Sequence, residues 1–373
     1  MKILCDKQTL LEGINGVQKA VSSKSTLPIL EGILITADND TVTLVGNDLE
    51  LSIKYTFTAQ VMKTGSIVLN SKTFGDIVRK MPDAPIYIEV GENNMASIKC
   101  GNVDFDIMGL LAAEYPKVAE INKDFYITIK ESTLRSMIRQ TIFALAVSEN
   151  KPILTGSLFD INDNMLTIVS VDGYRLALRR EFIGETGRQV STVIPGKTLG
   201  EVLKITKDED NDVYIYISEK HVLLEFEKFT VTSRVLDGEF INYKRTIPTE
   251  HSMEIIADVG MFSDSIDRAA LIINSDSAKS PIRMSIKGDI VTINCASQTG
   301  KVSDVIKVET ESTENLEIGF NYRYLLDAFK GCGYENVKML LSTALSPCLI
   351  VPDEGDEFLY MVLPVRLQNY DEN

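Results

Sequence analysis

The sequence has 373 residues, of which 44% are hydrophobic and 24% charged, and a formal net charge of −15. This length exceeds one ordinary hydrophobic core, so we expect a soluble globular protein of two or three domains. No apolar run reaches the roughly 20 residues that span a bilayer, and no signal-peptide pattern opens the chain, which predicts a cytoplasmic protein without a membrane partner. Five scattered cysteines, no CxxC motif and only two histidines argue against a disulfide framework and a zinc site.

A short alternating strand followed by an amphipathic helix occurs three times, beginning near residues 2, 126 and 253. The predicted helices span 7–24, 131–147 and 258–275. Their apolar stripes are Leu10, Leu11, Ile14, Val17 and Val21 in the first, Leu134, Met137, Ile138 and Ile142 in the second, and Phe262, Ile266, Ala269 and Ile273 in the third. The recurrence indicates an internal repeat.

A second strand-helix pattern also recurs, as "IVLNSKTFGDIVRKM", "TVIPGKTLGEVLKIT" and "LEIGFNYRYLLDAFK". It predicts helices over 71–80, 196–207 and 321–330. Strands with turn signals, such as "INDNMLTIVSVDGYRLALRR", lie between and after the two patterns. We therefore predict an α+β protein of three similar domains, each with two helices packed on antiparallel sheets, over residues 1–124, 125–250 and 251–373.

Basic residues occupy matching places in the second helix of each repeat. Aligning the three copies puts Lys72, Lys197 and Arg323 in register, and a second cation follows seven residues later at Arg79, Lys204 and Lys330. Seven residues are nearly two helical turns, so each pair shares one face. A solvated face is the alternative for any one copy, whereas three copies favour a phosphate-binding face. The predicted helix 258–275, with three aspartates against one arginine, departs from this trend.

The acidic stretch 207–212, "KDEDND", is the one candidate metal site. Asp208, Asp210 and Asp212 fit positions 1, 3 and 5 of a calcium loop, but Val213 stands where the sixth position requires glycine. We interpret it as a solvated acidic loop and expect no metal or cofactor. The sequence also lacks GxxxxGK[ST], HExxH and GxSxG motifs, which argues against catalysis. The alternative is an enzyme on a triplicated α+β scaffold, such as a metal-dependent nuclease that uses the acidic loops.

Motifs in all three repeats resemble one family. They are "TLPIL" (26–30), "NDLEL" (47–51), "ENKPILTG" (149–156), "VDGYRLAL" (171–178), "VLDGEFINYKRTIP" (235–248), "EIGFNYRYLLDAF" (317–329) and "LPVRL" (363–367). Their order resembles that of the bacterial sliding clamps, the beta subunits of DNA polymerase III, over the chain up to Leu367. The resemblance implies a DNA clamp fold and a ring-forming homodimer that encircles duplex DNA without reading its sequence.

The resemblance also implies a processivity factor with no catalysis of its own. Its expected partners are the DNA polymerase III alpha subunit, the clamp loader and other proteins that carry a clamp-binding motif. Lys24 matches a family position implicated in DNA contact, which adds it to the six helical cations. A third reading, a peptide-binding scaffold that never encircles DNA, would not need these cations.

Two further sites follow from the resemblance alone. The subunit interface of the family corresponds to Phe105 and Ile107 on one side and to Leu271 and Ile272 on the other; the alternative is that all four are core residues. A docking pocket for short linear peptides corresponds to Leu154, Thr155, Gly173, Tyr174, Arg175, Leu176, Ile241, Arg245, Thr246, Pro347, Met361, Val362, Leu363, Pro364, Val365 and Arg366. Apolar side chains would supply the affinity, and backbone groups and arginines would orient the peptide.

Overall fold

The computed structural model describes residues 1–22, 25–147, 150–273, 280–297 and 300–367. The chain forms two compact units: a first unit made of Met1–Arg135 with Gly200–Val235, and a second made of Ser136–Leu199 with Leu236–Asn373. The middle predicted domain therefore contributes to both units. Within the described residues, no helix is long and apolar enough to cross a membrane.

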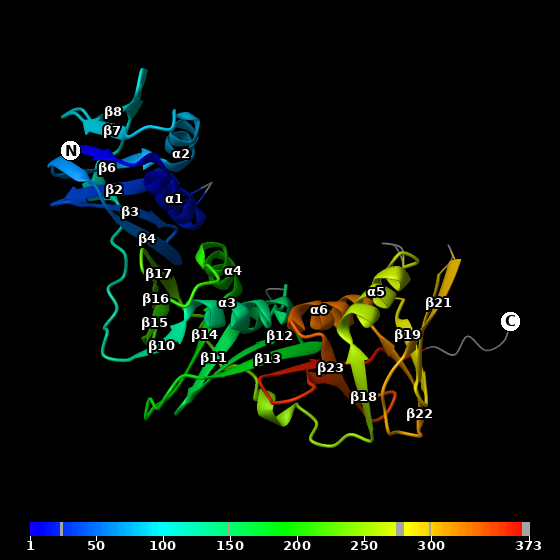
Figure 1. Ribbon diagram of the computed structural model, residues 1–373. Helices are drawn as coiled ribbons and strands as arrows, with labels where there is room; N and C mark the ends of the chain where they lie inside the picture. Colours follow the sequence, from blue (N-terminus) through cyan, green and yellow to red (C-terminus); the bar gives the residue numbers. More distant parts are fainter. Residues whose placement is uncertain (23–24, 148–149, 274–279, 298–299, 368–373) are drawn as a thin grey trace. The chain divides into compact units, whose positions relative to one another are not determined.

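Two antiparallel sheets build the first unit (Figure 1). The smaller has the order β5 (Gln60–Lys63), β1 (Lys2–Cys5), β7 (Ile86–Val90), β8 (Met95–Cys100) and β9 (Val103–Met108). The larger has the order β10 (Tyr126–Lys130), β15 (Asp212–Ile217), β16 (His221–Glu225), β17 (Phe229–Arg234), β4 (Leu51–Thr58), β3 (Thr41–Asn47), β2 (Gly32–Asp38) and β6 (Gly65–Asn70). Its first four strands come from the middle repeat and its last four from the first repeat.

The second unit repeats this plan. Its larger sheet has the order β14 (Gln189–Pro195), β11 (Gly156–Asn162), β12 (Met165–Val171), β13 (Arg175–Phe182), β25 (Phe358–Val362), β24 (Cys348–Pro352), β23 (Asn336–Leu341) and β18 (Met253–Asp258). The smaller has the order β21 (Gly300–Lys307), β20 (Ile290–Ser297), β19 (Ile282–Lys287) and β22 (Asn315–Phe320).

Strand pairing joins each repeat to the next. In the first unit β17 pairs with β4, in a register that places Thr232 opposite Ser52. In the second unit β13 pairs with β25, with Leu176 opposite Met361. Each larger sheet is therefore one continuous hydrogen-bonded surface made by two repeats, which confirms the predicted antiparallel sheets and the three-domain α+β architecture.

Each repeat carries two helices, as predicted. They are α1 (Lys7–Val17), α2 (Ser71–Lys80), α3 (Glu131–Arg139), α4 (Gly196–Ile205), α5 (Val259–Ala270) and α6 (Tyr322–Cys332). The first helix of each repeat is shorter than predicted. After α3, the Thr141 hydroxyl donates to the Met137 carbonyl at 2.8 Å, and a 3₁₀ turn over Ile142–Ala144 follows. Such a back-bond competes with helix continuation.

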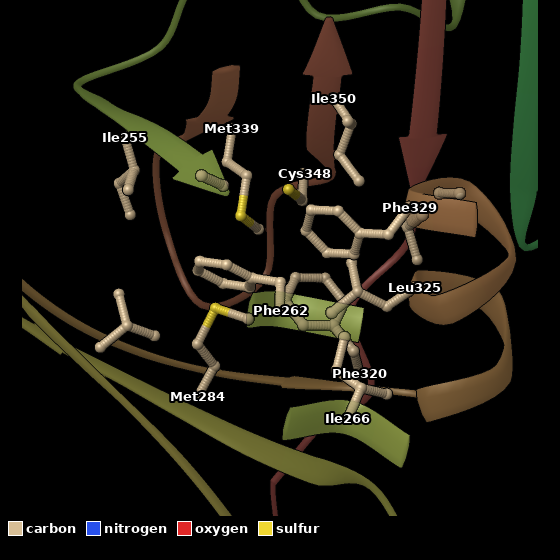
Figure 2. Close-up of a cluster of buried hydrophobic side chains, with 14 of the residues drawn as sticks. Ile255, Phe262, Ile266, Met284, Phe320, Leu325, Phe329, Met339, Cys348 and Ile350 are labelled. Carbon is tan, nitrogen blue, oxygen red and sulfur yellow. The ribbon is translucent and has the colours of Figure 1, made fainter. Parts of the chain in front are cut away.

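The predicted apolar stripes lie in the cores. Leu10, Ile14 and Val17 are fully buried in α1, and Phe262 and Ile266 of α5 are likewise buried. Figure 2 shows these two α5 side chains beside Leu325 and Phe329 of α6 and Met339 of β23, in the main core of the second unit. Rings of α5 and α6 stack there, with a centroid distance of 5.2 Å between Phe262 and Phe329.

Glycine sets the distance between α1 and the sheet of the first unit. A Cβ added at Gly16 would lie 2.2 Å from the Phe229 ring of β17. The ring also packs against Tyr55, with centroids 4.7 Å apart, so it cannot retreat into open space. The helix of the first repeat thus lies directly on a strand of the middle repeat.

We expect Gly16→Ala to lower the stability of the first unit by about 1–3 kcal/mol, because overpacking a filled core forces side chains and backbone apart. The matched control is Gly200→Ala in α4, where an added Cβ meets nothing within 4 Å. That change should be neutral or stabilising by up to about 1 kcal/mol, since alanine is the better helix former. Urea unfolding followed by circular dichroism measures both; equal midpoints for the two variants would contradict the close packing.

Candidate peptide and nucleic-acid binding sites

The larger sheet of the second unit has an apolar cluster on each face. Side chains alternate along a strand, so Ala177 of β13 joins the helix-side core while Leu176 and Leu178 face the other way. On that other face Leu176 packs in one cluster with Met361 of β25, and the segment 236–247 covers it with partly buried side chains that include Ile241. We call this cluster, with the adjoining 172–175 turn, the candidate peptide site.

The Asp-Gly turn predicted at 172–173 joins β12 to β13. Asp172 Oδ1 accepts hydrogen bonds from the amides of Tyr174, at 2.9 Å, and Arg175, at 3.1 Å. Gly173 has a φ of +95°, which only glycine adopts readily, and nothing lies within 4 Å of the place of its missing Cβ. The turn leaves Tyr174 62% exposed beside the cluster.

Arg175 belongs to the helix face of the sheet. Its side chain is 11% exposed, Nε lies 2.9 Å from Asp172 Oδ2, and Nη1 lies 2.5 Å from Asp327 Oδ2 of α6. Its guanidinium lies 4.5 Å from the ring centroid of Tyr324, a ring that also stacks on Tyr174 at 6.2 Å. These contacts occupy Arg175, so it braces the turn against α6.

The chain end is fixed to the same turn. The Leu363 amide donates to the Tyr174 carbonyl at 2.9 Å, and the Val365 amide donates to the Gly319 carbonyl at 2.8 Å. Met361 points into the candidate peptide site, whereas Val362 points into the helix-side core. Residues 361–365 thus hold one border of the site through backbone hydrogen bonds.

The remaining predicted pocket residues surround these. Leu154 is buried and Thr155 Oγ1 donates to the Pro152 carbonyl at 2.7 Å. Half-buried residues are Pro347 and Pro364; Arg245, Thr246 and Arg366 are exposed. The structure therefore brings Leu176, Ile241 and Met361 into one cluster, and places Arg175 and Val362 on the opposite face of the sheet.

Sequence reasoning missed two aromatic residues at this site. Tyr243 is 5% exposed in the same cluster as Leu176, and its hydroxyl donates to Asp160 Oδ2 at 2.8 Å. Burial, followed by this carboxylate, raises the pKa of the Tyr243 phenol, which keeps it a protonated donor. Tyr324 comes from α6. Both residues lie in motifs that carry the family resemblance, 235–248 and 317–329, but no local pattern singles out either ring.

Three of the predicted DNA-facing cations share a place in their helices. Lys72 is the second residue of α2, Lys197 the second of α4 and Arg323 the second of α6, and all three are exposed. A cation in the first helical turn opposes the positive end of the helix dipole. The arrangement costs stability by itself and suits a bound anion.

The second cation of each pair has an acidic neighbour. Distances from nitrogen to carboxylate oxygen are 2.7 Å for Arg79–Asp76, 2.8 Å for Lys204–Glu201 and 2.7 Å for Lys330–Asp267. Exposed pairs of this kind contribute little to stability and can exchange partners. Lys24 lies outside the described residues.

The predicted interface residues adjoin two sheet edges. Phe105 and Ile107 lie on β9, the edge of the five-stranded sheet, and Phe105 is 41% exposed. Leu271 is 80% exposed after α5, and the neighbouring Ile272 lies beside the start of β21, the edge of the four-stranded sheet. Phe105 and Leu271 are therefore not core residues of the single chain.

Acidic side chains of the candidate calcium loop contact protein groups. Asp212 pairs with Lys130 at 2.7 Å, and Asp210 accepts from the Ser132 hydroxyl at 3.4 Å. Across the described ranges, no group of three or more His, Cys, Asp or Glu side chains is arranged to hold a metal ion. Nothing in these ranges favours the nuclease alternative.

Comparison with known proteins gives one consistent family. Models of the DNA polymerase III beta subunit match in order: the N-terminal domain over residues 1–119, the central domain over 128–242 and the C-terminal domain over 244–366. The beta sliding clamp of Bacillus subtilis is 34% identical over 377 residues, with 98% of this chain and 100% of the relative covered. That of Halalkalibacterium halodurans is 32% identical over 380 residues, with the same coverage of both.

Solved structures agree. The DNA polymerase sliding clamp of Bacillus subtilis has a TM-score of 0.95 and 34% identity, and covers 99% of this chain and 100% of its own. A DNA polymerase III beta subunit from Eubacterium rectale has a TM-score of 0.94 at 34% identity and covers 98% and 100%. With matching domains in order and relatives covered over their whole length, the chain belongs to the DNA polymerase III beta subunit family, the bacterial sliding clamps.

Proposed function

We propose that two copies of this chain close into a ring around duplex DNA and act as a processivity factor for a DNA polymerase. The observation that carries the proposal is the repetition of one exposed cation at the second residue of α2, α4 and α6. Family membership supports DNA and a polymerase as partners. The domain boundaries 1–124, 125–250 and 251–373, the absence of catalysis and the cytoplasmic location belong to the same proposal.

Closure of the ring would occur by strand addition. The outer edges of β9 and β21 carry backbone groups that no described strand pairs, and such edges favour pairing with another chain. Head-to-tail pairing of β9 with β21 of a second copy would cover both edges. Charge agrees with it: Asp104 and Asp106 lie on β9, and Lys301 and Lys307 lie on β21. Asp104 pairs with Lys99 and Lys307 with Asp289, in exposed pairs that can exchange partners, and Asp304 of β21 is neutralised by Arg268.

Retention on DNA would then depend on topology rather than on affinity. Exposed cations at helix starts contact phosphates without reading bases, so they permit sliding. The chain as a whole is acidic, with a net charge of −15, which disfavours DNA elsewhere on its surface. A ring with a weakly cationic lining would therefore hold DNA loosely and release it only by opening or at a DNA end.

Partner proteins would dock at the candidate peptide site. The half-buried Ile241 and the exposed Tyr174 offer apolar contacts at the surface, above the buried Leu176 and Met361. A short segment with glutamine and paired leucine or phenylalanine side chains fits this chemistry: the apolar anchors supply affinity and backbone groups supply orientation. We assign the polymerase alpha subunit and the clamp loader to this site.

We expect Leu271→Lys to convert the dimer into a monomer at micromolar concentration, because it would bury an unpaired charge in the interface. Leu345→Lys is the control, since Leu345 is 65% exposed in a loop of the same unit. Native mass spectrometry reads the result. A dimer of unchanged strength with Leu271→Lys would exclude this interface.

A triple variant tests the DNA-facing cations. Replacing Lys72, Lys197 and Arg323 by glutamate should shorten retention on nicked circular DNA after loading and abolish polymerase stimulation. The salt dependence of DNA binding should become shallower by roughly 0.9 in log–log slope for each phosphate that the variant no longer neutralises.

Its control is an equal charge change away from the helices, at Lys54, Lys220 and Lys287, which are exposed on strands or in a turn. Both the helix variant and its control should leave the DNA when the circle is linearised. Stimulation that survives the helix variant would support a peptide scaffold that never encircles DNA, and equal retention on linear DNA would overturn the topological claim.

Ile241→Arg should weaken binding of a synthetic peptide with one glutamine and two leucines by about 10- to 150-fold, since a buried apolar anchor contributes about 1.5–3 kcal/mol. Phe182→Ala, at the far end of β13 where Phe182 is 63% exposed, should leave the affinity unchanged. Fluorescence anisotropy measures both. Unaltered binding by the Ile241 variant would place the docking site elsewhere.

A further inference from the structure

The first unit contains a small polar pocket of about 140 Å³. It lies where the β3–β4 turn, the end of β17 and residues 117–119 meet. The residues that line it are Asn47, Leu49, Glu50, Leu51, Ser52, Lys117, Val118, Ala119, His221, Thr232 and Arg234. A drug-sized ligand needs roughly 300–1,000 Å³, so this volume suits one side chain. We call it the polar pocket.

Strand register shows that the polar pocket is the repeat-related copy of the candidate peptide site. Ser52 pairs with Thr232 across β4 and β17, as Leu176 pairs with Met361 across β13 and β25. The turns match as well: the Asp48 amide donates to the Leu51 carbonyl at 3.0 Å, and the Asp172 amide to the Arg175 carbonyl at 3.3 Å.

The backbone hydrogen bond that follows the turn also corresponds in the two units. The Arg234 amide donates to the Glu50 carbonyl at 2.9 Å, as the Leu363 amide donates to the Tyr174 carbonyl. His221 lies opposite Arg234 at the start of β16. In the second unit Cys348 of β24 pairs with Val362 of β25, so Pro347, one residue earlier, lies opposite Leu363. Pro347 therefore holds in the second unit the place that His221 holds in the first. Two sites of one backbone design therefore differ in their side chains.

Hydroxyl side chains form the floor of the polar pocket, whereas apolar side chains hold the same places in the candidate peptide site. Ser52 is 5% and Thr232 7% exposed, in the places that Leu176 and Met361 hold in the second unit. Ser52 Oγ donates to the Gly46 carbonyl at 3.1 Å. A leucine or phenylalanine anchor would lose its apolar partners here and desolvate these hydroxyls, so the polar pocket disfavours the peptides proposed for the second unit.

The lining of the polar pocket has two cations, Lys117 and Arg234, and one carboxylate, that of Glu50, so it is net cationic in a protein of net charge −15. Lys117 is exposed, and the described residues offer it no ion-pair partner. Arg234 reaches only Glu50, at 3.4 Å in an exposed pair, which contributes little and can open. Burial, and then the nearby Arg234, lowers the pKa of His221, so the imidazole is neutral at pH 7 and retains an N–H donor.

The rim carries an exposed leucine in a strained turn. Leu49 has a φ of +78° and is 51% exposed, in the position of Gly173. Asn47 Oδ1 holds its amide at 2.9 Å, and Asp48 Oδ1 holds the Leu51 amide at 2.7 Å. A non-glycine residue in this region costs of order 1–3 kcal/mol and persists where the surroundings fix it. The turn therefore places the apolar side chain of Leu49 next to the polar pocket.

We propose that the polar pocket is a second docking site, which takes the carboxylate of one aspartate or glutamate side chain, next to an apolar residue, from a protein docked on the clamp. It rests on the proposed role of the chain as a docking platform. Lys117 and Arg234 face the carboxylate, and Leu49 contacts the neighbouring apolar side chain. One ring would then offer two chemically distinct docking sites per chain, each built on the same strand-turn-strand frame.

The test uses the full-length protein with methyl-labelled Leu and Val and two tripeptides, acetyl-Leu-Glu-Leu-amide and its Gln counterpart. The glutamate peptide should shift the methyl resonances of Leu49 and Val118 at millimolar concentration, with at least fivefold higher affinity than the glutamine peptide. Lys117→Gln, a change at an exposed residue, should remove that preference. Equal shifts by both peptides, or no shift at Leu49 and Val118, would overturn the proposal.

Two further arms separate the alternatives. Inorganic phosphate that shifts the same methyls and competes with the glutamate peptide on equal terms would mean a general anion site and would overturn the peptide assignment. The Ile241→Arg variant should keep the glutamate response, and Lys117→Gln should keep the affinity for the glutamine-dileucine peptide. If the glutamate peptide does not bind but the glutamine-dileucine peptide does, the further inference is wrong and the proposed function stands. If neither peptide binds, the proposed docking function is wrong as well.

Discussion

The pairing of strands between successive repeats is the constraint on which the other features depend. Because β17 adds to β4 and β13 adds to β25, each repeat completes its larger sheet with strands of its neighbour. The β13–β25 pairing brings residues 361–365 beside the 172–175 turn and forms the candidate peptide site. The outer edges of β9 and β21, in the smaller sheet of each unit, take no part in this pairing. One pattern of backbone hydrogen bonds thus joins the repeats within each unit.

The repeats share one backbone arrangement, but the side chains at equivalent positions are the same in some places and different in others. The start of α2, α4 and α6 keeps its cation in all three copies, which suits the regular polyanion proposed as its ligand. The two turn-and-strand sites that the units share differ completely, with Leu176 and Met361 in one and Ser52 and Thr232 in the other. In the proposed function the uniform cations contact one regular ligand, DNA, and the divergent side chains are proposed to give the two docking sites different ligands.

Apolar periodicity predicted the helices because their buried stripes are local. Leu10, Ile14 and Val17 are fully buried, and the strand-helix pattern recurs at a constant interval. Helix ends were predicted less well, since α1 and α3 pass into short 3₁₀ turns. After α3 the Thr141 hydroxyl competes with helix continuation, and periodicity carries no information about that competition.

The sequence by itself determined the threefold repeat, the antiparallel α+β architecture, the register of Lys72, Lys197 and Arg323 and the turn at Asp172-Gly173, because all are set by local spacing. Tertiary structure decided which residues meet across the chain. The family resemblance placed Met361, Leu176 and Arg175 in one pocket, whereas strand pairing puts Met361 with Leu176 on one face and turns Arg175 to Asp327 and Tyr324 on the other. Only the fold reveals Leu49 at a positive φ over the polar pocket. Contacts between residues far apart in sequence depend on register, and register is settled by burial of a whole sheet face rather than by any short segment.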